Sequence, residues 1–141
     1  MSASVTGSCL CGGVRYEVKP PAVRFQYCHC LSCRKATSSA HGAMIFFPPE
    51  NFRWLAGGEL IERFTDEKEN PGYMRWFCRT CGSAVPRFNR TRQFMLVPAG
   101  TLDGDPGVRP ERSIFWDERG PWYVGPEALP KFAEGPDSAP R

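Results

Sequence analysis

The sequence predicts a mainly β protein built from small antiparallel sheets, and three observations lead to this prediction. Fourteen glycines and fourteen prolines divide the 141 residues into short segments, which favours strands and turns over long helices. Val14, Tyr16 and Val18 alternate with charged residues, which is the period of a half-buried strand. Seven cysteines form three short clusters far apart in the chain. A metal ion bound by cysteines of two clusters would join distant pieces of the fold.

Apolar segments bounded by glycine or proline define the expected elements in chain order. The segments 52–55 and 59–64 flank Gly57-Gly58, an arrangement typical of a hairpin turn. The expected strands are 14–18, 25–28, 43–47, 52–55, 59–64, 73–77, 84–88 and 94–99, and the expected helical segments are 32–37 and 127–133.

Composition and the first residues narrow the class of protein. No apolar run approaches the roughly 20 residues that span a bilayer, and the start, MSASVTGS, lacks the basic and apolar regions of a secretory signal. We therefore expect a soluble, cytoplasmic protein, in which disulfides are disfavoured and cysteines serve metal binding or redox chemistry. Seven is also an odd number, which excludes complete disulfide pairing within one chain.

The first and last cysteine clusters have the spacing of zinc ligands. Cys9-x-Cys11 and Cys78-x-x-Cys81 each present two sulfurs from one turn, and four thiolates make a closed tetrahedral site. Sixty-six residues lie between Cys11 and Cys78, so one ion would tie the first strand to the middle of the chain. A redox dithiol at Cys78 and Cys81 is the alternative, although the βαβ context of thioredoxin-like proteins is lacking.

The middle cluster contains three cysteines, Cys28, Cys30 and Cys33, which leaves the fourth position of a tetrahedral zinc site open. Water would fill that position at rest, and a substrate thiol could replace it as thiolate because zinc lowers the pKa of a bound thiol. His29 or His41 could instead complete the site, but on a strand His29 would point to the opposite face. A disulfide with one spare thiol is a further alternative.

Charge gives no support to a nucleic-acid partner. The formal net charge is +3, and seven thiolates with two zinc ions would bring it to zero. Basic residues are spread along the chain with no run of five or six. Arg34 and Lys35 directly follow Cys33 and could attract an anionic thiol compound.

The three clusters, in this order, resemble the glutathione-dependent formaldehyde-activating enzyme family, which includes centromere protein V. The segments that carry the resemblance are GSCLCGG at 7–13, CHCLSCRK at 28–35, FCRTCGS at 77–83, AGTLD at 99–103 and a closing segment within 121–132. The resemblance covers residues 5–136, which we expect to form one domain followed by a loose tail at 137–141. It implies a tent-like fold of β-sheets with two zinc ions.

The resemblance also implies the ligand sets and a reaction. The structural zinc would be held by Cys9, Cys11, Cys78 and Cys81, and the catalytic zinc by Cys28, Cys30 and Cys33. The implied activity is that of a carbon–sulfur lyase acting on S-hydroxymethylglutathione, the adduct of glutathione and formaldehyde, or on a related thiol compound. The alternatives are a non-catalytic zinc-binding module for protein or nucleic acid, and a thiol redox or metal-buffer protein.

Two positions depart from the family's pattern. Ser113 stands where a histidine is common, and His41 stands where a bulky apolar residue is common. Both changes could reshape the pocket beside the open site.

Overall fold

A computed structural model describes residues 3–141 and shows a mainly β protein. The strands are β1 (Val5–Ser8), β2 (Arg15–Val18), β3 (Arg24–Cys28), β4 (Gly42–Phe47), β5 (Phe52–Ala56), β6 (Ile61–Thr65), β7 (Met74–Cys78), β8 (Arg87–Phe88), β9 (Met95–Pro98) and β10 (Ser113–Ile114). Helix α1 spans Leu31–Thr37, and short 3-10 turns lie at Pro49–Asn51, Gly58–Leu60, Ala99–Thr101, Trp116–Glu118 and Pro126–Ala128.

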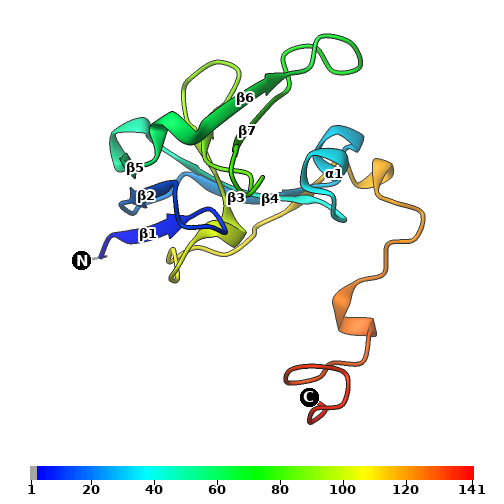
Figure 1. Cartoon of the computed structure of the whole chain (residues 1–141). Helices are drawn as coiled ribbons and strands as arrows, with labels where there is room; N and C mark the ends of the chain where they lie inside the picture. Colours follow the sequence, from blue (N-terminus) through cyan, green and yellow to red (C-terminus); the bar gives the residue numbers. More distant parts are fainter. Residues whose placement is uncertain (1–2) are drawn as a thin grey trace.

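The strands form three small sheets, as the sequence predicts. Their orders are β1-β2-β5, β10-β3-β4-β9-β8 and β6-β7. All neighbouring strands are antiparallel except β10, which runs parallel to β3. Figure 1 shows the β6–β7 hairpin standing above the other strands, with α1 at the far end of β3 and β4 from the N-terminus.

Two apolar clusters hold the three sheets together. In the first, Tyr16 and Val18 of β2 pack with Ile45 and Phe47 of β4 and with Val97 of β9, which joins the two larger sheets. The second cluster joins the β6–β7 hairpin to the loop after β1. Its buried members are Cys9, Val14, Ile61, Trp76, Cys78 and Val85. The cysteines at 9 and 78 therefore lie in the core itself, and burial of this apolar surface stabilises the contact between the hairpin and the loop.

The predicted hairpin at Gly57-Gly58 is wrong. The strand before it, β5, pairs with β2, and the strand after it, β6, pairs with β7, so the chain passes from one sheet to another at this point. Gly57 has a φ of +84°, and a Cβ there would clash with the carbonyl oxygen of Gly13 and lie 2.7 Å from Val14 Cα. The glycine thus serves a close backbone approach between segments rather than a two-residue turn.

The last part of the chain differs from the predicted helix at 127–133. Only Pro126–Ala128 forms a 3-10 turn, and Pro130 follows, which cannot donate the backbone hydrogen bond that a helix needs. Figure 1 shows this segment running away from the sheets toward the C-terminus. Its final residues fold back, with Arg141 N donating to Lys131 O at 2.8 Å. Within residues 3–141, no helix has the length and apolar character needed to cross a membrane.

Gly57→Ala tests the close approach between the two segments. Because the alanine would need a left-handed backbone and would clash with Gly13, we expect the free energy of unfolding to fall by about 2 kcal/mol in urea titration. Gly58→Ala is the matched control, since a Cβ there has nothing within 4 Å and should change stability by about 0.5 kcal/mol or less. Equal stability of the two variants would contradict this account.

Candidate metal centres

Four cysteine sulfurs from two distant loops converge at one point. Cys9 and Cys11 lie in the loop between β1 and β2, while Cys78 ends β7 and Cys81 lies in the turn after it. All four Sγ atoms lie within 4.8 Å of one another. The Sγ–Sγ distance is 3.6 Å for Cys9–Cys11 and 3.8 Å for Cys11–Cys78, well beyond a disulfide bond.

These distances fit a zinc ion. With zinc–sulfur bonds of about 2.3 Å, the edges of a tetrahedral four-sulfur site measure about 3.8 Å. The four side chains are free cysteines, and thiolates are the ligands that closed zinc sites favour. The residues present could therefore hold one zinc ion with no position left for substrate.

Glycines and backbone hydrogen bonds shape the two loops around this first centre. Gly12 and Gly82 both have a φ of +79°, which lets the chain turn tightly beneath each pair of sulfurs. Gly82 N donates to Cys78 O at 2.7 Å, and Val14 N donates to Cys9 Sγ at 3.3 Å. The first bond closes the turn between Cys78 and Cys81, and the second orients the Cys9 sulfur toward the centre.

Ser83 connects the two loops of the first centre. Its hydroxyl accepts a hydrogen bond from Leu10 N at 3.0 Å and lies 3.3 Å from Cys81 Sγ. The hydrogen bond with the Ser83 hydroxyl, followed by bonds from backbone N–H groups, lowers the pKa of Cys81 to about 5. Cys81 is therefore ready to ligate a metal as thiolate at neutral pH.

The second centre is built around the start of helix α1. Cys28 ends β3, Cys30 is the N-cap residue of α1, and Cys33 lies in its first turn. Their three Sγ atoms lie within 4.8 Å of one another, and Cys33 N donates to Cys30 Sγ at 3.3 Å. Among residues 3–141, no fourth His, Cys, Asp or Glu joins this group of potential ligands. The three sulfurs could hold a zinc ion with one position open.

Neither histidine belongs to this ligand group. β3 ends at Cys28, so His29 lies just after the strand rather than on one of its faces. His29 is fully buried, with its ring centroid 4.9 Å from that of His41 and 5.1 Å from that of Trp116. Both nitrogens of His29 lack a hydrogen-bond partner, and burial lowers the pKa of its imidazole, so the ring is neutral. His41 stacks on Tyr27 with ring centroids 4.2 Å apart.

His41 and Ser113, the two positions that depart from the pattern described above, line one cavity that is separate from the cysteine cleft. This cavity has a volume of about 500 Å³ and is also lined by Tyr27 of β3. The three cysteines do not line it. His41 and Cys33 both line a smaller cavity of about 210 Å³. A change of side chain at His41 would therefore alter a cavity that borders the second centre.

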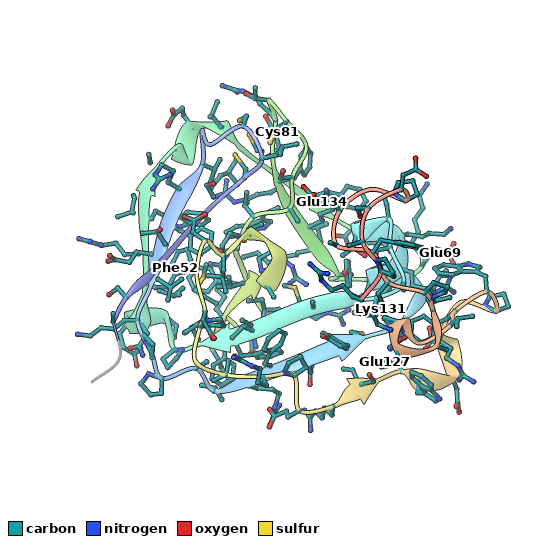
Figure 2. The ribbon with its side chains drawn as sticks, turned by 90° about the horizontal axis from the view of Figure 1, so that it is seen from below. Phe52, Glu69, Cys81, Glu127, Lys131 and Glu134 are labelled. Atoms are coloured by element: carbon teal, nitrogen blue, oxygen red, sulfur yellow. The ribbon has the colours of Figure 1, made fainter. Side chains whose placement is uncertain are left out.

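The second centre opens into a cleft of about 650 Å³, large enough for a small ligand. Its lining residues are Cys28, Cys30, Leu31, Ser32, Cys33, Glu69, Asn70, Tyr73, Arg90, Phe115 and Glu118. In Figure 2, Glu69 lies beside α1 whereas Cys81 lies at the other side of the fold, so the two cysteine centres are well separated. The first centre has four sulfurs, two of them from the buried residues Cys9 and Cys78, and the second has three sulfurs beside a cleft.

Tyr73 lines this cleft, and Arg87 lies behind its ring. The Tyr73 hydroxyl donates to Cys33 Sγ at 3.4 Å, and the Arg87 guanidinium lies 5.3 Å from the centroid of the Tyr73 ring. The pKa of Cys33 is lowered to about 6, chiefly by its hydrogen bond with Cys28 and, against the effect of burial, by the bond from Tyr73. Sequence patterns identified Tyr73 only as the start of a strand, since its contact with Cys33 depends on tertiary structure.

The fold and these two centres define a class: a small, mainly β protein with two cysteine centres that fit zinc. A sequence model of the glutathione-dependent formaldehyde-activating enzyme family matches residues 4–118, and the chain belongs to that family.

The chain is also similar to a curated protein and to a solved structure. A Halomonas elongata protein, provisionally named a glutathione-dependent formaldehyde-activating enzyme, is 30% identical over 94% of this chain and 89% of its own length. The crystal structure of a Rhodobacter sphaeroides protein is 25% identical and matches with a TM-score of 0.55, covering 77% of this chain and 97% of that chain.

Elemental analysis of the purified protein tests the two centres. We expect about two zinc ions per wild-type chain, and about one in each of Cys11→Ser and Cys30→Ser, because each change removes one ligand from one centre. Cys11→Ser should also lower the thermal midpoint more than Cys30→Ser, since only the first centre links distant segments. A full zinc content in either variant would contradict the ligand sets.

Tyr73→Phe tests the hydrogen bond to Cys33. The change keeps the ring beside Arg87 and removes only the donor, so we expect about tenfold weaker zinc binding at the second centre. Competition with a chelator on the full chain measures this affinity. Tyr27→Phe is the matched control on the opposite face of β3, and an equal effect of the two changes would contradict a specific role for Tyr73.

Proposed function

We propose that this protein is a zinc-dependent carbon–sulfur lyase that acts on a glutathione–aldehyde adduct of the S-hydroxymethylglutathione type or on a related thiol compound. The observation that carries the proposal is the convergence of three cysteine sulfurs at the wall of a 650 Å³ cleft, without a fourth ligand among the residues that the structure describes. Membership of the family and the name of the Halomonas relative support glutathione as the thiol.

In this proposal the two centres have different roles. Cys9, Cys11, Cys78 and Cys81 hold a structural zinc, and the three cysteines of the cleft hold the catalytic one. When bound there, zinc would stabilise a thiolate or polarise an aldehyde oxygen. Three thiolates already give the occupied centre a formal charge of −1, which keeps a fourth thiolate exchangeable. Cysteine ligands of this kind require reduced thiols, and we place the reaction in the cytoplasm for that reason.

The reaction breaks one carbon–sulfur bond without a change in oxidation state. In the adduct, the carbon–sulfur electron pair stays with the glutathione sulfur, the hydroxyl proton leaves, and the carbon–oxygen bond becomes the double bond of formaldehyde. The reverse direction forms the adduct from the same two products. Glu69 and Glu118 line the cleft, and we assign the exchange of the hydroxyl proton to Glu118, whose Oε1 accepts a hydrogen bond from Leu31 N at 3.2 Å.

The alternative, a non-catalytic zinc-binding module for protein or nucleic acid, would make both centres structural. A structural zinc is normally enclosed by four protein ligands, whereas the second centre offers three from residues 3–141 and faces a cleft. The arrangement therefore favours a small thiol ligand over a macromolecular partner. We also propose that residues 5–136 form a single domain.

Cys30→Ser tests the catalytic role of the second centre. We expect wild-type protein to accelerate exchange between formaldehyde and S-hydroxymethylglutathione, measured by NMR exchange spectroscopy, and Cys30→Ser to return that exchange to the uncatalysed rate. The variant should still fold and keep the zinc of the first centre. Ser39→Ala, an exposed change just after α1, is the control and should behave as wild type. Uncatalysed exchange with fully zinc-loaded wild-type protein would overturn the proposed reaction.

A further inference from the structure

Arg90 lines the cleft of the second centre, and two successive hydrogen bonds connect it to helix α1. Its Nη2 donates to Asn70 Oδ1 at 2.7 Å, and Asn70 Nδ2 donates to Ser32 Oγ at 3.1 Å in helix α1. Asn70 N in turn donates to Asp66 Oδ2 at 2.9 Å, which fixes the loop between β6 and β7. The guanidinium is therefore held by Asn70, which is itself bonded to helix α1, and it lines the same cleft as the three cysteines.

Arg90 also lies beside the backbone of the β6–β7 loop at Gly72. This glycine has a φ of +88°, and a Cβ on it would lie 3.7 Å from both Cδ and Nε of Arg90, an ordinary contact distance. The Arg90 side chain is exposed to solvent and makes one side-chain hydrogen bond, to Asn70, so its guanidinium is accessible to a ligand. The planar set of N–H donors on a guanidinium favours its use in recognition.

The charges around Arg90 point to an anionic ligand. Arg90 is the one cationic side chain lining the cleft, and within residues 3–141 none of the four ion pairs involves it. Only its Nη2 is engaged, so other N–H groups of the guanidinium remain available. Of the two acids in the cleft, Glu118 accepts a hydrogen bond from Leu31 N at 3.2 Å, which leaves Glu69 to attract a positive group.

We propose that Arg90 binds a carboxylate of the thiol substrate and restricts the site to peptide thiols that carry one. This inference rests on the proposed function, because it assumes that the thiol sulfur is held at the second centre. A guanidinium offers a planar pair of N–H donors that matches a carboxylate, and such charge-assisted bonds are stronger than those between neutral groups. Charges of both signs in one cleft suit a zwitterionic peptide thiol better than a simple neutral thiol.

Calorimetric titration of the zinc-loaded full chain tests the proposal. The probes are glutathione, its glycyl monoethyl ester and its diethyl ester, which remove one or both carboxylates but keep the thiol. We expect wild-type protein to bind glutathione about tenfold more tightly than the diester, as a charge-assisted hydrogen bond predicts. Arg90→Gln should bind glutathione and the diester equally. The monoester then shows which carboxylate Arg90 holds: the glycyl one if its affinity matches that of the diester, and the γ-glutamyl one if it matches that of glutathione.

Arg92→Gln is the matched control. It removes the same charge two residues away, from a side chain that lies 5.2 Å from the Phe88 ring and does not line the cleft. This variant should distinguish glutathione from its diester as wild type does. If wild-type protein binds glutathione and the diester equally, or if Arg90→Gln still distinguishes them, the role of Arg90 is wrong while the proposed function stands. If no thiol binds to wild-type protein, the proposed function itself fails.

Discussion

The arrangement of the fold depends on the convergence of Cys9 and Cys11 with Cys78 and Cys81. This contact joins loops 66 residues apart, and two of its cysteines, Cys9 and Cys78, belong to the apolar cluster that includes Val14. Metal ligation and burial of apolar surface therefore act on the same two segments. It fixes the β6–β7 hairpin over the other sheets. The loop of that hairpin carries Asn70 and Tyr73 to helix α1, where they border the second centre. The four-cysteine centre therefore positions one wall of the three-cysteine centre.

The open centre combines local and distant residues in a way that suits binding rather than stability alone. Its three sulfurs come from six consecutive residues at the junction of β3 and α1, so the ligands are set by local chain geometry. The groups that would meet a substrate come instead from three other segments. They are Glu69, Asn70 and Tyr73 near β7, Arg90 between β8 and β9, and Glu118 after β10. The metal ligands and the residues that would recognise a substrate are thus carried by different segments of the chain.

The sequence predicted the small antiparallel sheets and both cysteine groups because these leave local signals, namely alternating apolar residues and short cysteine spacings. It failed at Gly57, where a glycine pair typical of a hairpin instead serves a close approach to Gly13. It also left Tyr73 and Arg90 without a role, since neither lies in a motif and each reaches the second centre only through tertiary contacts. Two-residue strands such as β10 are too short to show any period.

X-ray absorption spectroscopy at the zinc edge, with and without glutathione, tests the central claim most directly. One closed four-sulfur centre and one open three-sulfur centre predict an average of about 3.5 sulfur ligands per zinc, rising to about 4 when a thiolate fills the open position. An average that glutathione leaves unchanged, or four protein ligands on both ions before it is added, would contradict the account.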